Sequence, residues 1–133
     1  MQVIPIYASA GITGFESPAA EYVQLGCDLN ELLIDHPSAT FIGQAKGDSM
    51  RGVGIFDNDI LIVDRHPVAQ HLDIIVANIN GEFVCKQFDI NRRLLLSANR
   101  KYQPVPILEH DTFSIEGIVT RSIRCFRPCY LFN

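Results

Sequence analysis

From Thr40 onward, short hydrophobic runs alternate with polar and turn residues. The runs are rich in Val, Ile and Phe, and they are separated by Gly, Asn, Asp or Pro, a pattern typical of β-strands. Six strands are predicted in this part of the chain: TFIGQAK (40–46), DILIVD (59–64), DIIVANIN (73–80), EFVCKQFDI (82–90), RLLLSAN (93–99) and FSIEGIVTRSIRCF (113–126). The pattern therefore predicts a mainly β fold.

A tight turn is predicted between the third and fourth of these strands. Asn80 and Gly81 stand between them, and this dipeptide favours the type I′ turn, whose twist matches that of a hairpin. Lys86 then lies well inside the fourth strand. Because side chains alternate between the two faces of a strand, Lys86 shares its face with Val84 and Phe88.

The residues before the first predicted strand have no regular hydrophobic period. Residues 1–22 hold two prolines and two glycines among small, apolar and polar residues, which predicts an extended arm. Asp28 is a suitable N-cap for a short helix over LNELLID (29–35), which the following His-Pro pair ends. We therefore expect an arm over 1–22 and one β domain over 23–133.

Length and composition fit one soluble domain. A chain of 133 residues can bury a core without disulfides or metal. Hydrophobic residues make up 47% and charged residues 20%, and no apolar run approaches the roughly 20 residues that span a bilayer. The first residues lack a basic stretch and are interrupted by Pro and Gly, unlike a secretory signal. We expect a cytoplasmic protein that does not engage a membrane.

Charge and cysteine content exclude further classes of function. The net charge is −4 and no block of basic residues occurs, so direct sequence-specific DNA binding is not expected. Without a secretory signal, Cys27, Cys85, Cys125 and Cys129 are expected to be reduced thiols. Cys125 and Cys129 lack a second pair or a histidine at metal-ligand spacing. Neither a metal nor a cofactor is expected.

Ser49, within GDSM (47–50), is a candidate nucleophile at the end of a strand. A serine hydroxyl is weakly nucleophilic unless a base removes its proton. Lys86 is one of three lysines and stands in an apolar strand, a setting that lowers the pKa of an amine. The carboxylates are candidate bases as well. The histidines are further candidates and lie in turn-like surroundings typical of solvated side chains: His36, His66, His71 and His110.

The residue pattern alone leaves two interpretations of Ser49 and Lys86 open. A neutral lysine is a competent base for a serine hydroxyl, and the backbone amides of Ser49 and Asp48 would supply oxyanion-hole donors if GDSM forms a tight loop. Alternatively, Lys86 keeps its amine in solvent at a sheet edge and Ser49 belongs to an ordinary turn.

Several blocks resemble a known family. GDSM (47–50), GIFDNDILIVD (54–64) and DIIVANINGEFVCK (73–86) resemble successive signatures of the S24 self-cleaving serine proteases, the LexA and UmuD group. GFESPAAEY (14–22) and DLNELLIDHPSATF (28–41) resemble the UmuD-type members. The resemblance covers nearly the whole chain. It implies a β-clip type catalytic domain with an extended N-terminal arm and one short helix.

The resemblance also implies roles for particular residues. Ser49 matches the nucleophile of the family and Lys86 matches its general base. Family members cleave their own N-terminal arm, usually at an Ala-Gly or Cys-Gly bond, and the alignment places that bond between Thr13 and Gly14. Threonine is bulkier than alanine or cysteine, so the Ala-Gly pair Ala10 and Gly11 is the alternative site.

A wider function follows from the resemblance alone. It implies an SOS-response protein that forms a homodimer, is activated by a RecA filament on single-stranded DNA, and serves a UmuC-like Y-family polymerase in error-prone translesion synthesis. The alternative is a dimeric module for such a polymerase that works without cleavage. A repressor is disfavoured because the roughly 40 residues before the protease core cannot hold a helix-turn-helix domain, and a signal peptidase would need a membrane anchor.

Overall fold

The computed structural model describes residues 29–128 of the chain. The chain comprises two compact units, Met1–Asp35 and His36–Asn133. The described part of the first unit contains the expected short helix, α2 (Leu29–Leu33), which has no buried residue. The predicted arm, its end at residue 22 and the Asp28 cap lie outside the described residues.

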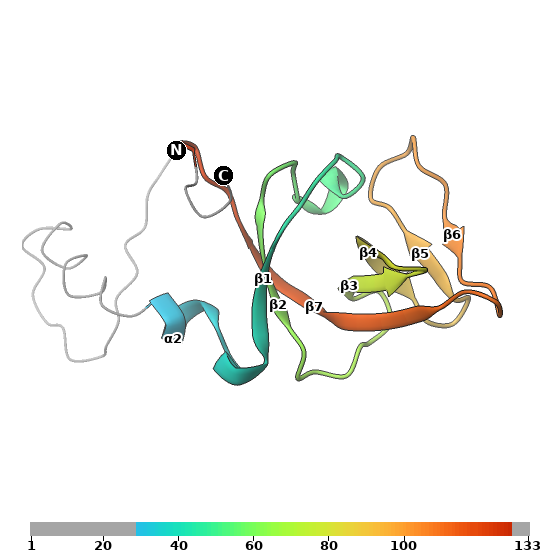
Figure 1. Ribbon diagram of the computed structural model, residues 1–133. Coiled ribbons are helices and arrows are strands. Elements are labelled where there is room, and N and C mark those ends of the chain that lie inside the picture. The colour runs from blue at the N-terminus through green and yellow to red at the C-terminus, as the bar shows by residue number, and fades with distance from the viewer. Residues whose placement is uncertain (1–28, 129–133) are drawn as a thin grey trace, which may run out of the picture. The chain divides into compact units, whose positions relative to one another are not determined.

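The second unit is built on one seven-stranded sheet (Figure 1). The strand order is β1-β2-β7-β3-β4-β5-β6, and every neighbouring pair is antiparallel. The strands are β1 (Thr40–Gln44), β2 (Ile60–Asp64), β3 (Ile74–Ile79), β4 (Glu82–Asp89), β5 (Leu94–Leu96), β6 (Val105–Pro106) and β7 (Phe113–Ile123). Within residues 29–128, the predicted mainly β fold with one short α-helix is confirmed. Two short 3-10 helices accompany the sheet, η1 (Pro37–Ala39) and η2 (Arg51–Val53).

Each of the six predicted hydrophobic runs contains one strand, but the strands are shorter than the runs. The last run ends as a strand at Ile123 rather than at residue 126. The structure also contains β6, a two-residue edge strand that was not predicted. Such a short pairing leaves no periodicity in the sequence, and its Pro106 is a residue that sheets accept mainly at edges.

The predicted hairpin between β3 and β4 is confirmed. Ile79 pairs with Glu82, so that Asn80 and Gly81 form a two-residue turn. Their φ angles are 52° and 86°, which is the left-handed conformation that a type I′ turn requires at both central positions. The turn fixes the register that sets Lys86 opposite Ile75.

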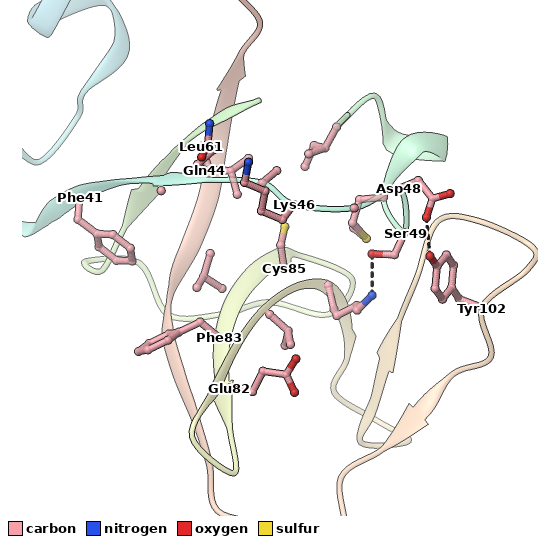
Figure 2. A pocket seen from close by; sticks show the side chains of 18 residues that line it. Phe41, Gln44, Lys46, Asp48, Ser49, Leu61, Glu82, Phe83, Cys85 and Tyr102 are labelled. Atoms are coloured by element: carbon pink, nitrogen blue, oxygen red, sulfur yellow. Dashed lines mark hydrogen bonds between the residues drawn. The ribbon is translucent and has the colours of Figure 1, made fainter. Parts of the chain in front are cut away.

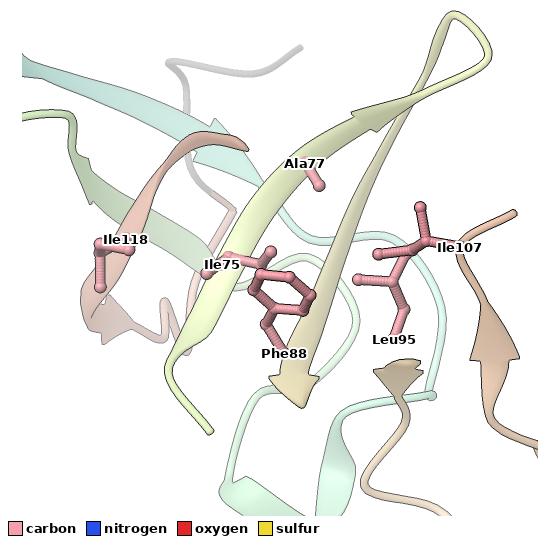
Figure 3. Packing of buried hydrophobic residues seen from close by; sticks show 6 residues of the cluster. All are labelled: Ile75, Ala77, Phe88, Leu95, Ile107 and Ile118. Atoms are coloured by element: carbon pink, nitrogen blue, oxygen red, sulfur yellow. The ribbon is translucent and has the colours of Figure 1, made fainter. Parts of the chain in front are cut away.

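Both faces of the sheet are packed. One cluster draws residues from β7, β3, β4, β5 and the position after β6, and contains Ile75, Ala77, Phe88, Leu95, Ile107 and Ile118 (Figure 3). The other lies beside the β1–β2 connection and contains Ala45, Met50, Ile55, Leu61 and Val63. Alternating residues of β3 and β4 contribute to different clusters, as the period of two in a strand requires.

β7 joins the two halves of the sheet. It pairs with β2 on one side and β3 on the other, and the register shifts once in each pairing. At Gly117, an added Cβ would stand 2.6 Å from Val63 Cγ1 and 3.0 Å from the Asp64 carbonyl oxygen, so the strands cross more closely there than a side chain allows. Because β7 lies between β2 and β3, it joins the strands that flank the β1–β2 connection and the β3–β4 hairpin into one sheet. Within residues 29–128, no helix is long and apolar enough to cross a membrane.

Candidate active site

Ser49 and Lys86 meet in the second unit. Lys86 Nζ donates a hydrogen bond of 2.7 Å to Ser49 Oγ, although 37 positions separate the two residues. Both line a pocket of about 660 Å³ between the β1–β2 connection and the β3–β4 hairpin. In Figure 2, the dashed line from Ser49 marks this contact. The structure thus brings together the two residues that the sequence singled out.

The residues on either side of Ser49 restrain the loop that carries it. Gly47 adopts a φ of 100°, which glycine reaches at little cost, and its amide donates to the Asp57 carboxylate at 2.7 Å. Met50, directly after Ser49, is 4% exposed and packs in a hydrophobic cluster. Ser49 is therefore fixed between a tight glycine turn and a buried side chain.

The β5–β6 connection supports the Ser49 loop from the other side. The Gly52 amide donates to the Ala98 carbonyl at 2.7 Å, and the Asn99 side-chain amide donates to the Asp48 carbonyl at 2.9 Å. A Cβ at Gly52 would stand 2.6 Å from the Ala98 oxygen. The approach of the two segments therefore depends on the missing side chain of Gly52.

The Asp48 carboxylate is bound by two side chains of the same connection. Lys101 Nζ lies 2.6 Å from one oxygen, and the Tyr102 hydroxyl donates to the other at 2.5 Å. Hydrogen bonds from Lys101 and then Tyr102 lower the pKa of Asp48, and the same contacts raise the pKa of each donor. The carboxylate stays ionised and ties the residue before Ser49 to the β5–β6 connection.

Lys86 occupies a partly buried position on β4. Burial lowers the pKa of its amine, because removal from water disfavours the charged form. Its amine also donates to Ser97 Oγ at 2.9 Å and lies 5.5 Å from the centre of the Tyr102 ring. Such a lysine reaches its neutral, basic form at a lower pH than an exposed one.

Cys85 also lines the pocket, but its thiol is poorly suited to nucleophilic attack. Burial raises the pKa of Cys85 to about 11, so the thiol remains protonated near neutral pH, and the thiolate is the reactive form. Ser49, whose hydroxyl contacts Lys86, remains the candidate nucleophile. Among residues 29–128, no group of three or more His, Cys, Asp or Glu side chains is arranged to hold a metal ion.

None of the four histidines lines the pocket. His36 Nδ1 lies 2.5 Å from the buried Asp64 carboxylate, and its ring stacks on His66 at 4.1 Å between centroids. His71 lies 3.6 Å from Asp89, and His110 lies 3.8 Å from Asp111. Of Lys86 and the four histidines, Lys86 is the one that the structure hydrogen-bonds to Ser49 Oγ within residues 29–128.

The remaining predicted site residues fall in two places. Asp48 lies beside Ser49 in the pocket lining. The two candidate bonds, Thr13–Gly14 and Ala10–Gly11, lie outside the described residues, so their cleavage remains a prediction.

Sequence reasoning missed Ser97, Asn99 and Tyr102, which all contact the site from the β5–β6 connection. The available signal was the register of the β4–β5 hairpin, in which Asp89 pairs with Leu94. That register sets the end of RLLLSAN near Lys86, but it depends on the length of the turn between the strands, which the hydrophobic pattern does not specify.

The sequence matches a known family over most of its length. Residues 3–120 match the model described as Peptidase S24-like. The chain is 39% identical over 127 residues to Protein ImpA of Salmonella typhimurium, covering 91% of this chain and 83% of ImpA. It is 38% identical over 122 residues to Protein MucA of the same organism, covering 90% and 84%. The LexA repressor of Ectopseudomonas mendocina (strain ymp) is 32% identical over 109 residues, covering 80% of this chain and 53% of the repressor.

The family match covers the residues that line the pocket. An S24-like match over residues 3–120 supports serine peptidase activity in general, and the candidate nucleophile Ser49 lies within the matched range. The similarity to ImpA and MucA extends over nine-tenths of the chain. The chain therefore belongs to the S24 peptidase family as a UmuD-like member.

Proposed function

We propose that the protein is a self-cleaving serine endopeptidase in which Ser49 is the nucleophile and Lys86 is the general base. The observation that carries the proposal is the 2.7 Å contact between Lys86 Nζ and Ser49 Oγ in an open pocket. This is within the distance over which a base removes the proton of a nucleophile.

The chemistry requires Lys86 to be neutral before the reaction begins. The neutral amine accepts the Ser49 proton while Ser49 Oγ attacks the carbonyl carbon of the scissile bond. The resulting ammonium then gives the proton to the departing amine, which leaves an ester on Ser49 that water hydrolyses. Burial supports this role because it lowers the pKa of Lys86.

The negative oxygen that forms during attack needs hydrogen-bond donors. We assign this role to the backbone amides of Ser49 and Asp48, because backbone donors held in a fixed loop are suited to stabilising an oxyanion. The contacts of Asp48 with Lys101, Tyr102 and Asn99 support the assignment, since they restrain the backbone on the amino side of Ser49.

The substrate is the N-terminal arm of the same protein. The Thr13–Gly14 bond is the proposed site, and the Ala10–Gly11 bond is the alternative. Glycine after the bond lets the backbone enter a narrow cleft. A tethered arm reacts at a high effective concentration, so weak affinity for the pocket is sufficient and other proteins are spared.

We place this cleavage in the SOS response. The similarity to ImpA and MucA supports a UmuD-like role, in which the shortened homodimer serves as the accessory subunit of an error-prone Y-family DNA polymerase. A RecA filament on single-stranded DNA would promote the cleavage. A second candidate is a dimeric module that binds the polymerase uncut, which Thr13 favours because a bulky β-branched residue precedes the bond.

Mapping the products of the purified full chain separates these candidates. The protein is incubated at mildly alkaline pH, or with RecA, ATP and single-stranded DNA, and the fragments are weighed by mass spectrometry. A fragment that begins at Gly14 supports the proposal, and one that begins at Gly11 moves the site to the alternative bond. A chain that stays intact under every condition supports the uncut module.

A further inference from the structure

The amine of Lys86 contacts two hydroxyl groups, not one. It donates to Ser49 Oγ at 2.7 Å and to Ser97 Oγ at 2.9 Å. Ser97 is half-buried, just beyond the end of β5. Ser97 neither attacks the scissile bond nor transfers a proton in the proposed cleavage.

The strand register places Ser97 beside Lys86. In the β4–β5 pair, Gln87 stands opposite Leu96, and continuing this register by one residue sets Ser97 opposite Lys86. Side chains of directly opposed residues lie on the same face of a sheet. The register of the β4–β5 hairpin therefore determines where the Ser97 hydroxyl lies.

Ser97 also begins the segment that holds the Ser49 loop. The next two residues bind that loop, Ala98 through its carbonyl to the Gly52 amide and Asn99 through its side chain to the Asp48 carbonyl. The two hydroxyls that contact Lys86 are therefore fixed relative to each other. The amine lies between them at distances that allow both hydrogen bonds.

The contact between Lys86 Nζ and Ser97 Oγ can orient the amine when it is neutral. Neutral Lys86 has two N–H donors and one lone pair, and proton removal requires the lone pair to face the Ser49 hydroxyl. Ser97 Oγ can accept one N–H bond and so orient the lone pair. After the Ser49 proton moves to Lys86, Ser97 still accepts from the ammonium and keeps its own proton, so it is neither consumed nor charged.

We propose that Ser97 is a positioning residue that orients the Lys86 amine toward Ser49. The inference rests on the proposed self-cleavage and adds a third side chain to its site. Because Ser97 accepts from the ammonium, it also favours the charged form of Lys86. Its removal should therefore both slow cleavage and ease the deprotonation of Lys86.

The ionisable side chains described near the Lys86 amine do not accept a hydrogen bond from it in place of Ser97. Cys85 is adjacent on β4 and stays protonated near neutral pH. The Tyr102 ring faces the amine from the β5–β6 connection, while its hydroxyl is engaged with Asp48. The Asp48 carboxylate is in turn paired with Lys101. Only the two serines supply side-chain oxygen atoms to Lys86 Nζ among its hydrogen-bond partners in the described part of the chain.

Cleavage kinetics of the full-length protein give the first test. Ser97→Ala should slow cleavage about tenfold at alkaline pH, the scale expected for losing one orienting hydrogen bond, and its pH–rate midpoint should move down. Ser97→Thr retains a hydroxyl and should restore most of the rate. Ser114→Ala is the matched control, since Ser114 is exposed on β7 and its hydroxyl binds Glu116. A purely structural role for Ser97 would slow Ser97→Ala without moving the midpoint, which would overturn the proposal.

A titration that needs no cleavage gives the second test. In protein labelled with ¹³C at lysine Cε, the Lys86 signal is followed by NMR in a Ser49→Ala background with and without Ser97→Ala. The second substitution should lower the Lys86 midpoint by about one pH unit, because it removes an acceptor from the ammonium. An unchanged midpoint refutes the role of Ser97 even if the wild type cleaves. Failure of the wild type to cleave refutes the proposed function instead.

Discussion

Arg124 and Asp59 form an ion pair at the C-terminal end of the β1–β2 connection that carries Ser49. The Arg124 guanidinium lies 3.0 Å from both carboxylate oxygens of Asp59, which is 1% exposed. Arg124 also donates to the Gly54 carbonyl at 3.0 Å and lies 4.0 Å from the centre of the Phe56 ring. The residue that follows β7 thus holds the loop that enters β2.

Arg124→Ala should lower both thermal stability and the cleavage rate. It leaves the buried Asp59 carboxylate without a charged hydrogen-bond donor, and a buried acceptor that loses its partner destabilises the fold. We expect Tm to fall by roughly 5–10 °C, measured by circular dichroism. Arg127→Ala, an exposed position beyond the same strand, is the control. Equal Tm values for the two variants would show that the pair does not hold the loop.

Cleavage should accelerate as pH rises. The amine of Lys86 must be neutral to accept the Ser49 proton, and burial lowers its pKa, so the midpoint of the pH–rate profile should lie below the value of about 10.4 for an exposed lysine. Lys86→Arg should be inactive at every pH, because a guanidinium stays charged. Initial cleavage rates, measured by gel densitometry across the neutral to alkaline pH range, test this dependence. A flat profile would exclude Lys86 as the titrating base.

Lys86→Met should make the folded protein more stable near neutral pH. The sign follows from burial: the folded state holds the ammonium in a less favourable setting than the unfolded chain does, so its pKa is lowered. The penalty is full at pH values below the lowered pKa and disappears above the pKa of the unfolded chain. Tm at pH 7 should rise by about 2–5 °C, and the gain should shrink toward pH 11. A lower Tm at pH 7 contradicts this.

The hairpin and the position of Lys86 could be predicted from sequence because their causes are local. Asn80 and Gly81 favour one turn type, and that turn sets the face and register of β4. The contact between Lys86 and Ser49 could not be derived in the same way. It depends on β7, the last strand of the described residues, lying between β2 and β3, and the residue pattern offered the pairing only as one of two interpretations until the family resemblance favoured it.

The supporting contacts of the site were beyond sequence reasoning for a further reason. Tyr102 belongs to a connection without a hydrophobic period, and Ser97 is a polar residue near the end of the run 93–99, so the hydrophobic pattern assigns neither residue to a site. Their positions follow from the β4–β5 register and from the close approach of Gly52 to Ala98. A glycine indicates a place where backbone can approach closely, but it does not identify the partner.

Tyr102→Phe should slow cleavage while preserving the fold. The substitution removes the hydroxyl that donates to Asp48 and keeps the ring near Lys86. We expect a loss of roughly two- to tenfold, the scale of one hydrogen bond. The pKa of Asp48 should rise, because a donor that favours the carboxylate is lost. NMR titration of the Asp48 carboxyl measures this, and an unchanged midpoint would show that the contact is not maintained in solution.

Gly117→Ala should destabilise the sheet where its two halves meet. The new Cβ would stand 2.6 Å from Val63 Cγ1, and Val63 is fully buried, so β7 or β2 must shift. Overpacking of this kind costs about 1–3 kcal/mol of unfolding free energy. Gly43→Ala on β1 is the control for stability, since nothing lies within 4 Å of its added Cβ. Urea unfolding compares the two, and equal losses would contradict the close crossing.

The central claim is that Ser49, activated by Lys86, cuts the arm of its own protein. Intact-mass spectrometry of wild type, Ser49→Ala and Lys86→Ala, incubated side by side at alkaline pH, tests it most directly. We predict an N-terminal fragment and a shortened chain from the wild type, and uncut protein of native secondary structure from both variants. Cleavage of Ser49→Ala at the wild-type rate would contradict the claim.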